Sequence, residues 1–235
     1  NGIIDVNSID KLNGLVYKTQ GFAQNKNYYL FQKLGPTPVQ ILAHGGDCSD
    51  KSRLVSAILS EYDVRSTLVM LHPCETCASG HTVVEAEATD GLIVVDPVYG
   101  FGLPKKSGGF YDLHALRSDP SILKQRLSKL VSIRGSADKI ARYNQSDGGS
   151  HYGFPRTINW KKNAVLSTAK DLVGVFVKYP EFLYRPRFME DPKLFLTLFS
   201  AFVSLMFMTA AAASHYFYKR RNLGDTPTLK YSNIS

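Results

Sequence analysis

The sequence lacks the patterns that mark nucleotide and nucleic-acid binding. It contains no glycine-rich phosphate loop, and its lysines and arginines form no stripe interleaved with aromatic residues. Its formal net charge is nevertheless +8. The basic residues are densest beside an apolar run near the C-terminus, where they favour solubility and attraction to anionic lipid. The composition therefore argues against a nucleic-acid partner and in favour of a membrane surface.

Cysteine is scarce, with three in 235 residues. Cys74 and Cys77 form a CxxC motif, whereas Cys48 stands alone. Three interpretations of the motif are open. Together with His72 and His81 it has the residue types of a zinc site. A redox-active CxxC would prefer a helix start, which the sequence does not show. A Cys74–Cys77 disulfide, or a pair of simple thiols, leaves His81 free for other chemistry. We favour the last interpretation, which predicts no metal site.

The middle of the chain predicts one helix followed by three strands. Apolar residues recur at three- and four-residue spacing from Cys48 to about Tyr62, which indicates an amphipathic helix. β-branched and apolar residues predict strands over 64–71, 81–88 and 92–96. A Thr-Asp-Gly turn between the last two strands indicates an antiparallel hairpin. We therefore expect the order helix, strand, strand, strand, with the last two strands antiparallel.

Cys48, His81 and Asp96 have the residue types and positions of a catalytic triad. Cysteine attacks as its thiolate, which the N-terminal end of a helix and a neighbouring imidazolium both stabilise. Cys48 lies at the predicted start of the helix, while His81 opens one hairpin strand and Asp96 ends the other. Pairing of the strands brings the imidazole near the carboxylate and leaves one ring nitrogen for a thiol. The local signals do not themselves bring the helix to the strands.

Three segments resemble the transglutaminase-like superfamily and follow its order. They are GDCSD at 46–50, HTVVE at 81–85 and VVDP at 94–97, and successive triad residues are separated by 33 and 15 positions. The resemblance covers residues 35–100, under a third of the chain. The Thr-Val that follows the histidine here departs from the Trp or Tyr that is common in the family.

The resemblance implies a papain-like α+β core in which the nucleophile helix packs on an antiparallel sheet. It assigns Cys48 as nucleophile, His81 as base and Asp96 as the residue that orients the base. Family members often add an aromatic or amide side chain to the oxyanion hole, for which Gln40 and Gln32 are candidates. The backbone N–H of Cys48 would supply one donor in any case. This chemistry requires no metal or organic cofactor.

Leu194–Tyr218 predicts a membrane-spanning helix. It has 25 residues without Asp, Glu, Lys or Arg, and about 20 apolar residues cross the hydrocarbon core. The segment ends in three aromatic residues, and Lys219–Arg221 follow it. This pattern favours a cytoplasmic C-terminus and a catalytic domain outside the cytoplasm. The chain begins with Asn1 rather than Met, so the absence of a leader says little about targeting.

Outside these motifs the sequence predicts less. Residues 1–35 favour a strand or short helices, and helices are expected at 121–131 and 163–177. Loops are expected at 101–109 and 145–153. The predicted divisions are a catalytic domain at 1–160, an amphipathic and juxtamembrane linker at 161–192, the membrane helix at 193–218 and a basic tail at 219–235.

The sequence thus predicts a membrane-anchored cysteine hydrolase or acyltransferase, of the bacterial membrane-anchored type within the family. Its substrate would be a protein or peptide, and the acyl group would pass through a Cys48 thioester. Peptidase, amidase and acyltransferase activities all stay open. The alternative is a silent transglutaminase-like subunit that scaffolds a membrane complex, because Ala210–Ala213 permit close helix approach within a membrane.

Overall fold

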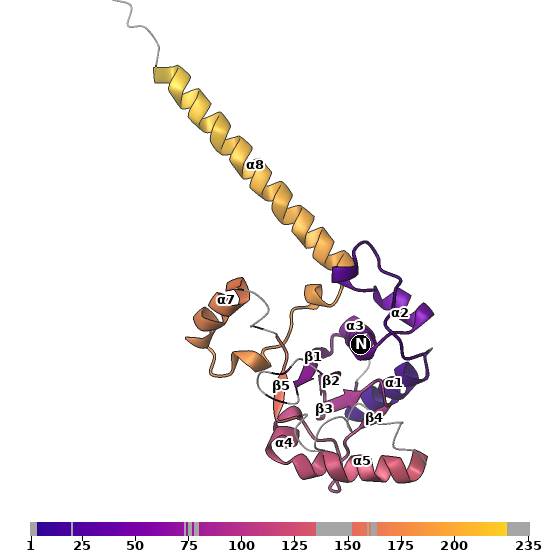
Figure 1. Ribbon diagram of the computed structural model, residues 1–235. Coiled ribbons are helices and arrows are strands. Elements are labelled where there is room, and N and C mark those ends of the chain that lie inside the picture. The colour runs from indigo at the N-terminus through magenta and orange to yellow at the C-terminus, as the bar shows by residue number, and fades with distance from the viewer. Residues whose placement is uncertain are drawn as a thin grey trace, which may run out of the picture. The chain divides into compact units, whose positions relative to one another are not determined.

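The computed structural model divides the chain into two compact units, Asn1–Pro192 and Lys193–Ser235 (Figure 1). Most of the loop predicted at 145–153 and of the basic tail predicted at 219–235 lies outside the residues that the structure describes. The described residues are 4–19, 21–72, 74, 77, 80–134, 152–158, 160 and 164–224.

An antiparallel sheet of five strands runs through the first unit in the order β4-β3-β2-β1-β5. The hairpin of β2 and β3 turns where the Thr-Asp-Gly sequence predicts it, and β2 also pairs antiparallel with β1. The antiparallel sheet and the α+β class are therefore confirmed. The strands are β1 (Arg65–His72), β2 (His81–Ala88), β3 (Gly91–Asp96), β4 (Phe101–Gly102) and β5 (Phe154–Arg156).

Helices lie before, between and after the strands in sequence. The predicted helix at 48–62 is α3, and the helices predicted at 121–131 and 163–177 are α5 and α7. In the described part of the first unit the helical elements are α1 (Val6–Lys18), η1 (Gln32–Leu34), α2 (Pro38–His44), α3 (Cys48–Glu61), α4 (Leu113–Ser118), α5 (Pro120–Arg134), α7 (Ala164–Gly174), η4 (Pro180–Phe182) and η5 (Arg187–Met189).

The sheet has a separate apolar core on each face. Val84 and Val95 face α1, α2 and α3, where Ile9, Ile41 and Val55 complete the contact. The residues that alternate with these along β2 and β3 face the other side of the sheet, against α4 and α5. This second core contains Val83, Val94, Leu116, Leu123 and Leu127. The alternation follows from the two-residue period of a strand, and it produces a helix–sheet–helix arrangement.

The chain outside the motif region differs from the sequence expectations in three places. Within residues 1–35, most of the residues in regular secondary structure belong to one helix, α1. Its buried stripe includes Val6, Ile9 and Val16. The loop expected at 101–109 contains the short strand β4, because Phe101 and Gly102 pair with the end of β3. Strand β5 had no sequence signal. It pairs with β1 across more than 80 residues of chain, which local patterns do not reveal.

Residues 184–191, expected as part of a linker, are bound to the rest of the first unit; we call them the 184–191 strap. The backbone N–H of Arg185 donates to Thr67 Oγ1 at 3.2 Å. The buried carboxylate of Glu190 pairs with Arg185 Nε at 2.6 Å and with Arg53 Nε at 3.4 Å. Arg53 and Glu190 are 137 residues apart, which is why the sequence suggested a linker here.

The second unit contains α8 (Pro192–Gly224). Its apolar part, Pro192–Arg221, has 30 residues. At about 1.5 Å per residue this helix is roughly 45 Å long, which exceeds the hydrocarbon thickness of a bilayer. It is therefore long and apolar enough to span a membrane.

Candidate active site

His81 and Asp96 meet at one edge of the sheet. Val84 pairs with Val95, so the first residues of β2 lie beside the last residues of β3. His81 Nε2 donates to Asp96 Oδ2 at 2.7 Å, because an ionised carboxylate only accepts. Both side chains are buried, with 1% of each residue exposed. The structure thus forms the base–carboxylate contact that the hairpin predicted.

The Asp96 carboxylate is held on both oxygens. While Oδ2 accepts from His81, Oδ1 accepts from the backbone N–H groups of Val98 at 2.9 Å and Tyr99 at 3.1 Å. The N–H of Gly100 closes the turn by donating to the Asp96 carbonyl at 2.8 Å. A carboxylate bound in this way keeps a fixed orientation toward the imidazole.

Two residues that the sequence did not identify support this pair. Asn13 of α1 is fully buried; with its amide turned so that both ends are satisfied, Nδ2 donates to the Asp96 carbonyl at 3.1 Å and Oδ1 accepts from the Phe101 N–H at 3.2 Å. The ring of Tyr99 lies 5.6 Å from the His81 ring, centroid to centroid. A sequence signal for Asn13 exists, because it is the polar member of the apolar stripe of α1.

Cys48 is the first residue of α3. Asp47 caps the helix: its carboxylate accepts from the N–H groups of Ser49 at 2.9 Å and Asp50 at 3.1 Å. Asp50 returns the contact by accepting from the Asp47 N–H at 3.3 Å, which completes a capping box. Gly46 is required before the cap, since a Cβ there would lie 2.3 Å from Asp50 Cβ. The Cys48 thiol is free and partly exposed.

Serine side chains on α3 attach this helix to the sheet. Ser52 Oγ donates to the carbonyl of Thr82 at 3.1 Å, and Ser56 Oγ shares a hydrogen bond of 2.9 Å with Ser66 Oγ. Cys48, Ser52 and Ser56 are spaced by four residues, so they lie on one face of the helix. Ser52 therefore brings the turn that carries Cys48 against the strand that begins with His81.

The electrostatics of His81 reflect both of its neighbours. Burial alone would lower the pKa of His81, but the charge and hydrogen bond of Asp96, with those of Cys48, raise it from 6.5 to about 9. Because Nε2 is engaged with Asp96, the remaining ring nitrogen, Nδ1, is the one available to Cys48. At neutral pH this arrangement favours an imidazolium between a carboxylate and a thiol.

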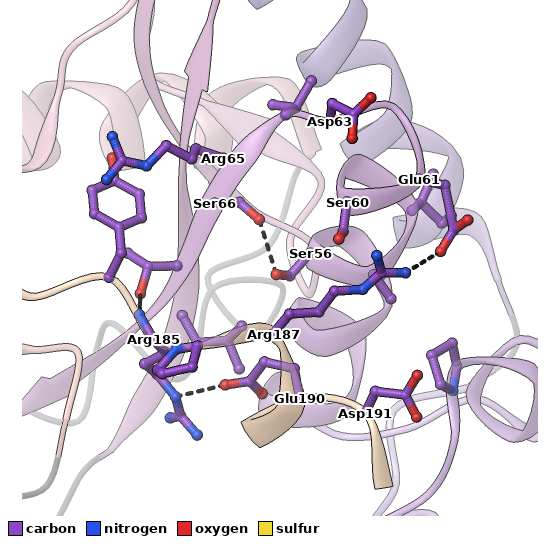
Figure 2. A pocket seen from close by; sticks show the side chains of 18 residues that line it. Ser56, Ser60, Glu61, Asp63, Arg65, Ser66, Arg185, Arg187, Glu190 and Asp191 are labelled. Atoms are coloured by element: carbon purple, nitrogen blue, oxygen red, sulfur yellow. Dashed lines mark hydrogen bonds and ion pairs between the residues drawn. The ribbon is translucent and has the colours of Figure 1, made fainter. Parts of the chain in front are cut away.

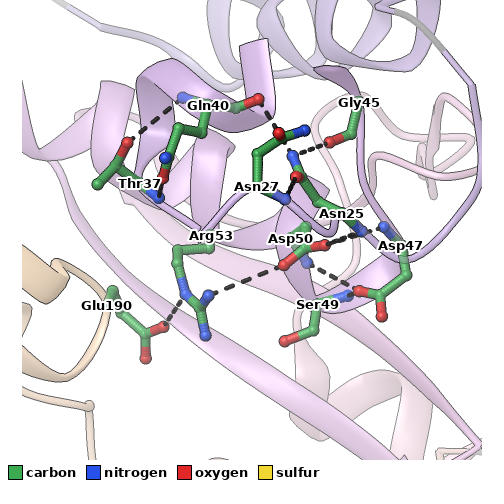
Figure 3. A network of polar contacts seen from close by, with 10 residues as sticks. All are labelled: Asn25, Asn27, Thr37, Gln40, Gly45, Asp47, Ser49, Asp50, Arg53 and Glu190. Carbon is green, nitrogen blue, oxygen red and sulfur yellow. Dashed lines mark hydrogen bonds and ion pairs between the residues drawn. The ribbon is translucent and has the colours of Figure 1, made fainter. Parts of the chain in front are cut away.

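A polar network holds the backbone that precedes Cys48 (Figure 3). Asn25 Nδ2 donates to the carbonyl of Gly45 at 2.7 Å and to that of Gln40 at 3.1 Å. Its backbone N–H donates to Asp50 Oδ2 at 3.4 Å. Burial, and to a lesser degree the charge of Asp47, raises the pKa of Asp50. Three hydrogen bonds from Asn25 thereby hold the loop that leads into α3.

The network assigns Gln40 a local role. Its Oε1 accepts from the Thr37 N–H at 2.8 Å, while its own N–H donates to Thr37 Oγ1 at 3.3 Å, a capping box at the start of α2. Gln32, the other candidate, is an exposed residue of η1. An oxyanion role for Gln40 stays a prediction that this geometry does not favour. The backbone N–H of Cys48 stays the donor that we expect.

Cys74 and Cys77 are joined by a disulfide in the loop between β1 and β2. His72 Nδ1 donates to the carbonyl of Cys77 at 2.8 Å, which ties the end of β1 to this loop. A disulfide withdraws both thiols from metal binding, and His81 is engaged by Asp96. Within the described ranges, no group of three or more His, Cys, Asp and Glu side chains is arranged to hold a metal ion.

A cavity in the described part of the chain lies away from these residues. It has a volume of about 570 Å³ and lies against the second half of α3, the beginning of β1 and the 184–191 strap (Figure 2). The Ser56–Ser66 hydrogen bond and an ion pair of Glu61 with Arg187 border it. Cys48 is at the opposite end of α3, so this cavity is not where the thiol would meet a substrate.

Comparison of the chain with known protein families, with curated proteins and with solved structures gives no match. The transglutaminase-like resemblance therefore depends on the residue pattern alone. The geometry contributes a separate argument: a free thiol at a helix start, an imidazole beside it and a fixed carboxylate behind the imidazole. This arrangement suits nucleophilic attack by sulfur followed by proton transfer from nitrogen.

Proposed function

We propose that the protein is a membrane-anchored cysteine enzyme of transglutaminase-like type that cleaves or transfers an amide-linked acyl group. The observation that carries the proposal is the buried His81 Nε2–Asp96 Oδ2 contact of 2.7 Å, beside a Cys48 that helps to raise the pKa of the imidazole. A structural histidine would not need a free, partly exposed thiol on its second side. The papain-like description of the core belongs to the same proposal.

In the acylation step the Cys48 thiolate attacks the amide carbonyl. The carbon–sulfur bond forms, and the negative charge moves to the carbonyl oxygen, where the Cys48 N–H stabilises it. The imidazolium of His81 then gives its proton to the amine as the carbon–nitrogen bond breaks, which leaves a thioester and a neutral imidazole. Asp96 keeps the ring oriented and stabilises its charged form.

In the second step water or an amine attacks the thioester. His81 removes the proton of the attacking group, the carbon–sulfur bond breaks and the Cys48 thiolate and the imidazolium are restored. With water the result is hydrolysis, and with an amine it is acyl transfer. The partly exposed thiol suits a substrate as large as a protein or peptide.

We place the catalytic unit outside the cytoplasm and the C-terminus inside. Two observations support this orientation. The basic residues Lys219–Arg221 follow the apolar part of α8, as expected on the cytoplasmic side. The Cys74–Cys77 disulfide of the first unit suits an oxidising compartment.

Acylation by a nitrophenyl ester tests the proposal. The full chain in detergent should gain one acyl group on Cys48, detected by mass spectrometry and removed by hydroxylamine. Cys48→Ser should gain none, and His81→Ala should react far more slowly. If the folded wild-type chain stays unmodified while a small free thiol reacts, the enzyme proposal fails and the scaffold alternative is favoured.

A further inference from the structure

The chain exposes a compact apolar patch at the end of α7, residues 172–179, which we call the 172–179 patch. Leu172 is 66% exposed, Val175 75%, Phe176 88% and Tyr179 52%. Single exposed apolar side chains are ordinary on a soluble surface, but four large ones within eight residues need a partner.

The patch is a folded surface of the first unit. The N–H groups of Phe176 and Val177 donate to the Val173 carbonyl at 3.0 and 2.9 Å, which extends the helical path beyond Gly174. On the far side, Trp160 Nε1 donates to the Pro180 carbonyl at 3.0 Å. The exposed side chains therefore project from a hydrogen-bonded backbone that is anchored at both ends.

The charges around the patch suit the phosphate groups of a lipid surface. Lys170 and Lys178 flank the apolar run, and both are partly or fully exposed; they outnumber Asp171, the one acidic residue between them. Lys178 Nζ lies 5.4 Å from the centre of the Tyr179 ring. Apolar side chains bordered by tyrosine and lysine are the composition of segments that lie in the interface of a bilayer.

A short length of chain joins the patch to α8. Pro192, the first residue of α8, comes 13 positions after Tyr179 in the sequence. At no more than about 3.6 Å per residue, the patch stays within roughly 47 Å of the first residue of α8. A protein that α8 anchors would therefore keep the patch within that distance of the start of its membrane helix.

We infer that the 172–179 patch inserts its apolar side chains into the interface of the bilayer that α8 spans. The occupant is lipid, with the phosphate groups of its headgroups contacting Lys170 and Lys178. The inference rests on the membrane placement in the proposed function and is independent of the chemistry of Cys48. It would give the first unit a second membrane contact, in addition to its covalent link to α8.

Tryptophan quenching by brominated acyl chains tests the inference in the full chain. The chain contains one tryptophan, so Trp160→Phe provides a background for single reporters. The reporter is Phe176→Trp in vesicles of phosphatidylcholine and phosphatidylglycerol. The control is Leu15→Trp, a well-exposed apolar position, 63% exposed, on α1. Brominated lipid should quench the Phe176→Trp reporter several-fold more than the Leu15→Trp control.

Two further measurements keep the outcome decisive. Phe202→Trp in α8 reports whether that helix lies in the bilayer; if its indole is not quenched, the membrane placement fails. If it is quenched while the Phe176→Trp indole is quenched no more than the Leu15→Trp indole, the inference is overturned. If the emission of the Phe176→Trp reporter changes only with the protein-to-lipid ratio, a second copy of the protein covers the patch. This result would also overturn the inference. If Trp160→Phe does not fold, the added quenching over wild type is measured with Trp160 retained.

Discussion

The hydroxyl of Ser52 donates to the carbonyl of Thr82 at 3.1 Å, and both residues are buried. Ser52 is one helical turn after Cys48, and Thr82 directly follows His81. This hydrogen bond therefore connects the helix that carries the thiol to the strand that carries the imidazole.

Ser52→Ala should weaken the Cys48–His81 arrangement. It leaves the Thr82 carbonyl without this donor, which costs about 1–3 kcal/mol in a buried site. We expect lower stability in detergent and slower iodoacetamide labelling of Cys48. Ser56→Ala is the matched control, because it removes the bond to Ser66 on the same helix face but two turns away from Cys48. Equal labelling rates in the two variants would contradict the role of Ser52.

Stability should depend on pH through His81. Its pKa is raised from 6.5 to about 9 in the folded chain, so the folded state binds the proton more tightly than the unfolded state. The stabilisation is complete below pH 6.5 and is lost as the pH rises through about 9. Urea unfolding should therefore show that His81→Gln destabilises the chain more at about pH 6 than at about pH 10. A cost that is unchanged or larger at the alkaline pH would refute the assignment.

Glu190→Ala should destabilise the first unit strongly. The substitution removes the shared partner of Arg53 and Arg185, whose side chains are 14% and 16% exposed. Removing one member of a buried charge pair costs about 3–5 kcal/mol, and the partial exposure of both guanidinium groups places the expected loss at the lower end. Urea midpoints measure it. Glu61→Ala, which removes an exposed pair with Arg187, is the control and should change the midpoint little.

Gly100→Ala should be costly because of its position in the turn that holds Asp96. Its φ is +62°, and a Cβ there would lie 2.5 Å from Cγ of the Tyr17 ring. The left-handed backbone costs about 1–2 kcal/mol with any Cβ, and the overlap adds about 1–3 kcal/mol. Gly21→Ala should have the same cost from a left-handed backbone, since the φ of Gly21 is +53°, but its Cβ would meet nothing within 4 Å. A similar loss of stability in both variants would show that the Tyr17 contact is unimportant.

The elements around the candidate site could be predicted because their signals are local. The periodicity after Cys48 and the β-branched runs beside His81 and Asp96 predicted helix and strands within a residue or two of their observed ends. The turn between the last two strands then placed histidine and aspartate at one edge of the sheet. Each of these steps used residues close together in the chain.

The rest depends on contacts between distant residues. Ser52 and Thr82 are 30 residues apart, and Asn13 reaches Asp96 from α1, which lies near the start of the chain. Glu190 looked like part of a linker because its partner Arg53 is 137 residues away. Gln40 is a different case, because Thr37 followed three residues later by Gln40 is the sequence pattern of a capping box, so a local signal for its contact with Thr37 was present.

The central claim is that Cys48 is an activated nucleophile, and its rate of labelling by iodoacetamide at neutral pH tests this most directly. Cys48 is the one thiol outside a disulfide among the three cysteines, so without reductant the labelled site is unambiguous. We expect labelling faster than that of a small free thiol, and loss of this advantage in His81→Ala. Labelling of the folded wild-type chain that is no faster than that of a free thiol, and unchanged in His81→Ala, would contradict the account.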